Sequence, residues 1–224
     1  MQRTFPLRPV PFALRRLTRR RSRFGFLFCA GLAMAALGGL EPLGTASAQS
    51  AQNGAATRFV EQKQRELQQA IRVSKDTKSD PKLLAIFDSM LNYDRLTHEA
   101  LKQHWDEITP EQRVEVTSLL KQLVQNSYRK NLRDPGNYGI DYLGEHSAKD
   151  GTLVQTRTSN KKNPREKPLS IDYVVEQVGG RWLVHDVVTD GVSLVRNYRR
   201  QFSRIIKKKG IDGLMTQLRK QLDK

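Results

Sequence analysis

The chain has 224 residues, a formal net charge of +16 and a single cysteine. This length suits one domain with a sizeable core, and one cysteine excludes a framework of internal disulfides. The basic residues are not accompanied by glycine-rich or aromatic-interleaved motifs, which argues against a nucleic-acid-binding protein.

The N-terminal segment, residues 1–48, is predicted to be a secretory signal peptide. Eight arginines and no acid stand in residues 1–23, followed by the apolar run FGFLFCAGLAMAALGGL and by a small-x-small site at Ala46 and Ala48. The alternative is a retained membrane anchor, but a run of this length is at the short limit for a span. Cleavage after Ala48 would remove the cysteine, eight arginines and one acid, which leaves a mature chain of charge +9 in the periplasm.

Residues 49–56 are polar and small and predict a flexible N-terminus, so residues 57–224 form the expected single domain. Helical periodicity then predicts four amphipathic helices, over 57–73, 81–91, 93–105 and 110–132. Asp80 precedes Pro81 as an N-cap, and Thr109 with Gln112 forms a capping box.

His98 and Glu99 begin the stretch HEALKQH, which resembles the zinc-protease motif H-E-x-x-H. The second histidine, His104, comes six residues after the first instead of four. At about 100° per residue, six steps place the two rings roughly 240° apart around the helix. We therefore interpret this stretch as an amphipathic helix and not as a metal site.

The apolar period changes from 3.6 to 2 after the Asp134-Pro135-Gly136 break. Four segments with strand character follow, joined by a turn at 148–151, a basic loop and a Gly179-Gly180 turn. The segments are NYGIDYLGEH, TLVQTRTS, LSIDYVVEQV and RWLVHDVVTDG. Short turns between consecutive strands predict a four-stranded antiparallel meander with one strongly apolar face.

Two more amphipathic helices are expected after Gly191, separated at Gly210. The predicted fold is therefore α+β, a four-stranded antiparallel meander sheet packed against about six helices. Six helices offer more apolar surface than one face of a small sheet needs. The excess permits either a solid core or an apolar cavity between sheet and helices.

Sequence motifs for catalysis are absent: the chain has no G-x-S-x-G motif and no phosphate-binding loop. Asp172 and Asp186 lie on neighbouring predicted strands, where they are either paired carboxylates or residues that bond a turn. We expect no enzymatic activity. The alternative is a small enzyme or a polar-ligand-binding module on a cone-shaped sheet-and-helix fold.

Two blocks resemble the MlaC family of periplasmic phospholipid carriers. The first, YDRLTHEALKQHWDEITPEQRVEVTSLLKQLVQNSYRKNL, has the family's aromatic–Asp pair, its His-Trp helix end and its T-P-E-Q-R helix start. The second, IDYVVEQVGGRWLVHDVVTDGVSLVRNYRRQF, has the D-Y strand, the G-R-W turn and the G-V-S-L-x-x-N-Y-R-x-Q-F helix entry. The resemblance covers residues from about 57 to 220, and the sequence differs from the family pattern mainly in the basic loop 161–167.

The resemblance implies a monomeric, soluble shuttle that needs no cofactor and carries phospholipid as its cargo. Its partners would be an outer-membrane lipoprotein and an inner-membrane ABC transporter complex. The mature domain, 57–224, would be a lipid-binding domain that encloses an apolar lipid cavity.

Alternation along the strands and helical spacing predict which apolar residues face inward and line that cavity. They are Phe87, Leu91, Leu120, Val124, Tyr142, Ile171, Tyr173, Val175, Val184 and Tyr198. A basic cluster on the helix after Gly191 is predicted to dock on acidic partners or anionic lipid headgroups, the alternative being a solvated face. Its members are Arg199, Arg200, Arg204 and Lys208.

Overall fold

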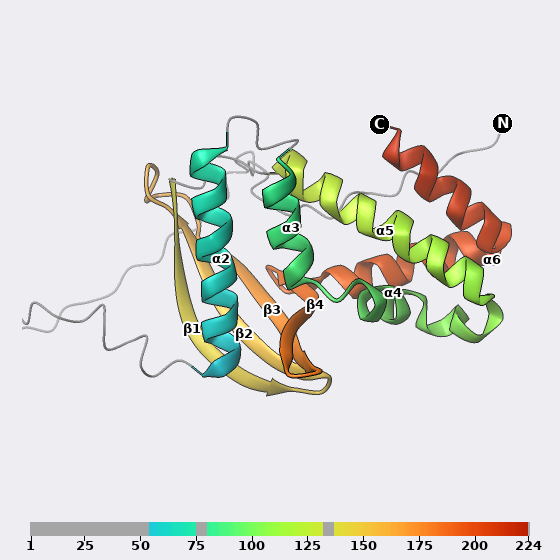
Figure 1. The fold of residues 1–224 in the computed structure, drawn as a ribbon, viewed down its shortest axis with the longest axis horizontal. Coiled ribbons are helices and arrows are strands. Elements are labelled where there is room, and N and C mark those ends of the chain that lie inside the picture. Colours follow the sequence, from blue (N-terminus) through green and yellow to red (C-terminus); the bar gives the residue numbers. More distant parts are fainter. Residues whose placement is uncertain (1–53, 75–79, 132–136, 224) are drawn as a thin grey trace, which may run out of the picture.

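A five-stranded antiparallel sheet and five α-helices make up the part of the chain that the computed structural model describes, residues 54–74, 80–131 and 137–223 (Figure 1). The fold is α+β, as predicted. The predicted signal peptide, 1–48, lies outside the described residues. Of the predicted flexible N-terminus, 49–56, residues 55 and 56 already belong to the first described helix.

The sheet has the order β1-β2-β3-β4-β5, and every neighbouring pair is antiparallel. The strands are β1 (Tyr138–Ala148), β2 (Gly151–Asn160), β3 (Leu169–Val178), β4 (Arg181–Thr189) and β5 (Val192–Ser193). The four predicted strands are present, but the predicted strand count was wrong by one. Asp190 and Gly191 both have positive φ, 46° and 78°, and they form a two-residue hairpin that returns the chain as β5.

The β3–β4 pair contains a bulge at His185. Val174 pairs with Asp186 and Val175 pairs with Val184, so His185 is the extra residue. Its ring is buried, and its Nε2 lies 2.8 Å from the carbonyl oxygen of Asp150. The neighbouring Gly151 has φ 146°, and a Cβ there would approach the Val175 carbonyl oxygen to 2.3 Å, so this turn requires glycine.

The helices begin close to where capping residues predict. Asp80 accepts a hydrogen bond from the Lys82 backbone N–H, and the Thr109 backbone N–H and the Gln112 side chain form the reciprocal half of a capping box. The helices are α2 (Ala55–Val73), α3 (Pro81–Met90), α4 (Tyr93–Leu101), the 3₁₀ helix η1 (Lys102–Glu107), α5 (Pro110–Asn131) and α6 (Leu194–Leu222).

One helix prediction needs correction. The helix expected over 93–105 is α-helical only to Leu101 and continues as η1, which holds His104 and Trp105. The two helices expected on either side of Gly210 are both present: the element labelled α6 consists of two helical segments that meet at a kink at that residue. Gly210 has φ 68° and ψ −176°, a backbone conformation that side chains with a Cβ rarely adopt, so the helical direction changes there (Figure 1).

The helices form two groups around the sheet (Figure 1). Helix α2 crosses one face of the sheet over β1 and β2, with α3 beside it. Helices α4, α5 and α6 pack on one another, and α4 and α6 reach the sheet at β4. In the part of the chain that is described, no helix is both long enough and apolar enough to cross a bilayer.

Candidate functional site

One face of the sheet carries all five of the predicted sheet-borne lining residues. Tyr142 pairs with Thr156, Val154 pairs with Tyr173, and Val175 pairs with Val184. Because side chains alternate along a strand, these pairs and Ile171 point to the same side of the sheet. The bulge at His185 keeps Val184 in phase with Val187, and both are buried.

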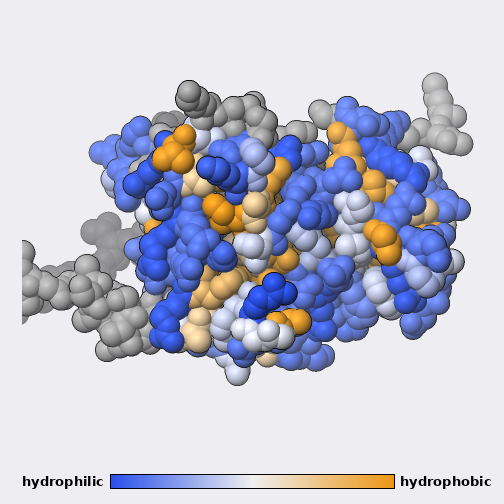
Figure 2. Space-filling model, in the orientation of Figure 1, coloured by the Kyte–Doolittle hydropathy of each residue, from blue (hydrophilic) through white to orange (hydrophobic). Residues whose placement is uncertain are grey.

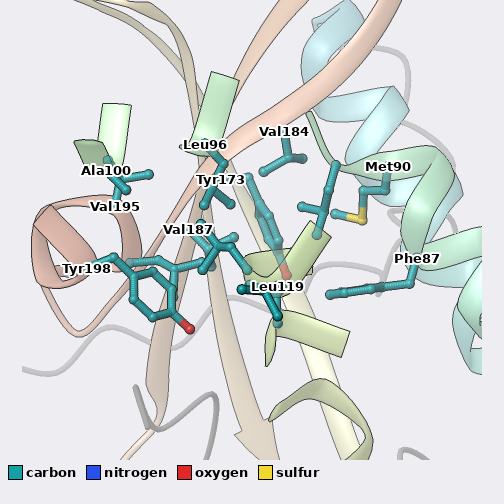
Figure 3. Packing of buried hydrophobic residues seen from close by; sticks show 14 of the residues in the cluster. Phe87, Met90, Leu96, Ala100, Leu119, Tyr173, Val184, Val187, Val195 and Tyr198 are labelled. Carbon is teal, nitrogen blue, oxygen red and sulfur yellow. The ribbon is translucent and has the colours of Figure 1, made fainter. Parts of the chain in front are cut away.

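The helices supply the other five predicted lining residues. Phe87 lies on α3, Leu91 follows α3 and makes a bridge to Val184, and Tyr198 lies on α6. Leu120 and Val124 lie on α5. All ten residues join one apolar cluster between the sheet and the helices. In Figure 3, Phe87 and Leu119 turn toward Tyr173 from two different helices. That the ten line a lipid cavity stays a prediction.

Burial in this cluster decreases along the strands. The row Val154–Tyr173–Val187 is buried, and the exposed fractions of Val175 and Val184 are both 0%. One row further along the strands, Thr156 is buried, whereas Tyr142 and Ile171 on either side of it are half-buried. The next row, Ile140–Thr158–Leu169, is half-buried throughout. The inward face is therefore less buried toward the end where β2 leads into β3 than in its middle rows.

Several polar side chains that border the apolar cluster are uncharged. The Gln64 amide on α2 donates a hydrogen bond of 2.7 Å to the Tyr173 hydroxyl, and the ring of Tyr128 stacks on Phe87 with centroids 4.1 Å apart. Burial raises the pKa of Tyr128, Tyr142 and Tyr173 well above the ordinary value, and that of Tyr198 to about 12. These hydroxyls therefore stay neutral and offer hydrogen bonds without charge.

Gln64 and Tyr128 were not among the predicted site residues. Tyr128 follows Val124 by four positions on α5, so helical spacing alone would have found it. Gln64 and Tyr173 are 109 positions apart, and no local pattern links them.

A polar junction ties α3 to its neighbours. The Asp88 carboxylate accepts hydrogen bonds from the Tyr93 hydroxyl at 2.7 Å and from the Gln125 amide at 2.8 Å, and Lys121 Nζ lies 2.9 Å away. Burial alone would raise the pKa of Asp88, but these three partners outweigh burial and hold that pKa below its ordinary value. The junction fixes Phe87, one residue earlier, against α5.

Asp172 and Asp186, the carboxylates considered as a catalytic pair, each accept hydrogen bonds from a backbone N–H and a serine hydroxyl. Asp172 accepts from the Thr156 backbone N–H and from the Ser170 hydroxyl. Asp186 accepts from the Val195 backbone N–H at 3.0 Å and from the Ser193 hydroxyl, and so holds the start of α6 against β4.

The two histidines of the HEALKQH stretch have separate partners. His98 packs edge-on against Trp105, whereas His104 Nδ1 lies 2.8 Å from a Glu107 carboxylate oxygen. Across residues 54–74, 80–131 and 137–223, no group of three or more histidine, cysteine or acidic side chains is placed to hold a metal ion.

The predicted docking cations have unequal surroundings. Arg200, Arg204 and Lys208 are exposed on α6. Arg199 is half-buried and reaches α4, where its Nε lies 2.7 Å from the Glu99 carbonyl oxygen and a terminal nitrogen lies 2.9 Å from the Glu99 carboxylate. Arg199 is thus engaged within the fold, while docking by the exposed cations stays a prediction.

Comparison with known proteins gives matches of three kinds: a family model, curated relatives and solved structures. The family model described as MlaC protein matches residues 58–220. A protein of Haemophilus influenzae, the intermembrane phospholipid transport system binding protein MlaC, is 24% identical over 148 residues, which are 63% of this chain and 69% of the relative. A phospholipid-binding protein from Ralstonia solanacearum, solved in complex with a phospholipid, superimposes with a TM-score of 0.63 at 25% identity, over 76% of this chain and 100% of that one.

Proposed function

Because this chain belongs to the MlaC family, we propose that it is a periplasmic phospholipid carrier and that residues 57–224 are its lipid-binding domain. Phospholipid is the cargo, and the chain needs no resident cofactor and catalyses no reaction. Two relatives support this proposal. The protein from Haemophilus influenzae is a phospholipid transport system binding protein, and the protein from Ralstonia solanacearum was solved in complex with a phospholipid.

The observation that supports the proposal is the single apolar cluster between sheet and helices. The polar side chains that border it, those of Gln64, Tyr128, Tyr142 and Tyr173, are neutral. Acyl chains need an apolar enclosure, and a few uncharged hydrogen-bonding groups are compatible with the ester region of a lipid.

Energetics explain why a carrier is needed. Two acyl chains contain about 30 methylenes, and at about 0.8 kcal/mol for each methylene their exposure to water costs about 24 kcal/mol. A protein that moves phospholipid through water must therefore shield nearly all of both chains. Loading and unloading exchange one apolar environment for another, so they require no chemical step.

We further propose that the carrier moves lipid between an outer-membrane lipoprotein and an inner-membrane ABC transporter complex. Brief docking on both suits an electrostatic surface, because charge attraction raises the association rate more than it deepens the affinity. Arg200, Arg204 and Lys208 on α6 are the exposed candidates for this contact.

A vesicle transfer assay tests the carrier function. Residues 49–224 are added in small amounts to donor vesicles that contain a fluorescent phospholipid and to unlabelled acceptor vesicles. We expect the rate of lipid transfer to rise in proportion to the protein concentration. A rate that stays at the level without protein, with intact folding verified by circular dichroism, would contradict the proposal.

A further inference from the structure

The half-buried end of the inward face, where β2 leads into β3, is followed directly by the loop 161–168. Thr158 of β2 pairs with Leu169 of β3, and the loop joins these two strands immediately beyond that half-buried row. The C-terminal end of α2 and the N-terminal end of α3 lie at this same end of the molecule (Figure 1). Apolar side chains also reach the surface where α2 and α3 lie side by side (Figure 2).

Exposed cations surround this end. Arg165 and Lys167 lie in the loop, Arg72 lies in the last turn of α2, and Lys82 lies in the first turn of α3. We call these four residues the basic rim. Lys167 precedes Pro168, and a residue before proline favours an extended backbone. Continued alternation from Leu169 therefore places Lys167 on the same side of the strand as Ile171.

Lys161 is basic too, but it belongs to the other face of the sheet. Its backbone N–H donates to the carbonyl oxygen of Asn137, and its Cε lies 3.2 Å from the position that a Cβ on Gly139 would occupy. Gly139 is out of phase with Ile140 and Tyr142, which face the interior. Lys161 is therefore not a member of the basic rim.

The nearby acids already have partners. The Asp80 carboxylate accepts from the Lys82 backbone N–H at 2.8 Å as the N-cap of α3. The Glu166 carboxylate accepts from the Asn160 amide at 2.8 Å. These bonds hold both acids in fixed positions, and the Asp190 carboxylate likewise accepts from the Ser170 backbone N–H at 3.1 Å.

We propose that this end is the mouth of the lipid site and that the basic rim selects phospholipids whose headgroup has a net negative charge. This inference rests on the proposed carrier function and adds a headgroup class to it. With the acyl chains among the apolar side chains, the headgroup comes to lie at the half-buried row, within reach of the rim. In a zwitterionic lipid, the positive group of the headgroup balances the negative phosphodiester. An anionic lipid keeps a net negative charge, so each nearby cation stabilises its bound state.

The test is competitive loading. Delipidated protein is incubated with vesicles of equal phosphatidylglycerol and phosphatidylcholine content, re-isolated and extracted, and the two bound lipids are quantified by mass spectrometry. We expect phosphatidylglycerol to be enriched roughly fivefold, the factor that about 1 kcal/mol of surface attraction gives. The variant Arg165→Gln/Lys167→Gln should lose most of this enrichment while its total bound lipid stays the same.

The variant Lys149→Gln/Arg181→Gln is the matched control, because it removes the same charge from two exposed residues at the opposite end of the sheet, at the β1–β2 and β3–β4 turns. It should keep the enrichment. Raised sodium chloride should reduce the enrichment in the wild-type protein, and phosphate at equal ionic strength should reduce it no further, because the rim holds a lipid headgroup and not free phosphate.

Three outcomes overturn the inference: no enrichment in the wild-type protein, unchanged enrichment in the rim variant, or equal loss in the Lys149→Gln/Arg181→Gln control. A protein that loads neither lipid contradicts the carrier function itself, so failure of the two proposals is distinguishable.

Discussion

A single buried carboxylate, that of Glu99, binds some of the cations of this basic chain within the fold. Glu99 is buried on α4, and Arg95, Lys102 and Arg199 all place nitrogens within 3.5 Å of its carboxylate. Arg199 comes from α6, so this contact joins two helices. Arg200 is its neighbour in sequence and points outward. A basic run that looks uniform in the sequence therefore contains cations with different surroundings, since Arg199 is bound to Glu99 and Arg200 is exposed.

Replacement of Arg199 by alanine should destabilise the fold. The Glu99 carboxylate would lose its closest cation while it stays buried, which costs about 2 kcal/mol, less than for a fully buried pair because Arg95 and Lys102 remain. Arg200→Ala serves as the control and should change stability by about 0.5 kcal/mol or less. Urea unfolding measures both, and equal midpoints for the two variants would refute the structural role of Arg199.

Asp88 should make stability depend on pH in the acid range. Its pKa is depressed in the folded chain, so its contribution is fully present above the pKa of the unfolded chain, near 4, and is lost as the pH falls through the folded pKa. Asp88→Asn should be less stable than the wild-type protein at pH 7, and this difference should shrink below about pH 4. Thermal unfolding across pH 3–7 tests this, and a difference that does not change with pH would contradict it.

At the level of elements, local patterns were sufficient for most of the fold. Alternation placed Tyr142, Ile171, Tyr173 and Val175 on one face, and the cap residues Asp80 and Thr109 predicted two helix starts. The hairpin at Asp190-Gly191 was missed although Asp-Gly is a strong turn pattern, because the two-residue strand after it has no alternation to detect.

Other features depend on contacts between distant segments. The change from α-helix to 3₁₀ helix at Leu101 accompanies Trp105 stacking under the Arg113 guanidinium, 4.7 Å from the ring centroid. The Gln64–Tyr173 bond and the bulge at His185 likewise require the assembled sheet. For the site, the sequence indicates which face of the sheet points inward, whereas the burial of each residue on that face depends on the helices packed against it.

The inward face of the sheet is tested by a pair of substitutions. Ile171→Gln places an amide among the proposed lining residues, where an unpaired polar group costs about 1–2 kcal/mol, and phospholipid affinity should fall roughly five- to thirtyfold. Val174→Gln changes the opposite face of the same strand, and it should leave lipid binding unaltered. Vesicle-uptake titrations compare the two, and equal losses of affinity would reject the assignment of faces.

For the whole molecule, the parts support one proposal. The sheet and helices pack around one apolar cluster, exposed cations lie on α6 and near the β2–β3 loop, and the family is MlaC. The carrier function joins these features, since a lipid shuttle needs an apolar enclosure, one opening and a surface for docking. The signal peptide predicted over 1–48 would deliver the domain to the periplasm, where that function belongs.

The most direct test of this account is lipid extraction from the purified mature protein, followed by mass spectrometry. The account predicts phospholipid in a fixed molar ratio to protein, and the same ratio restored when delipidated protein is incubated with phospholipid vesicles. Folded protein that yields no phospholipid as purified and takes up none from vesicles would contradict the account.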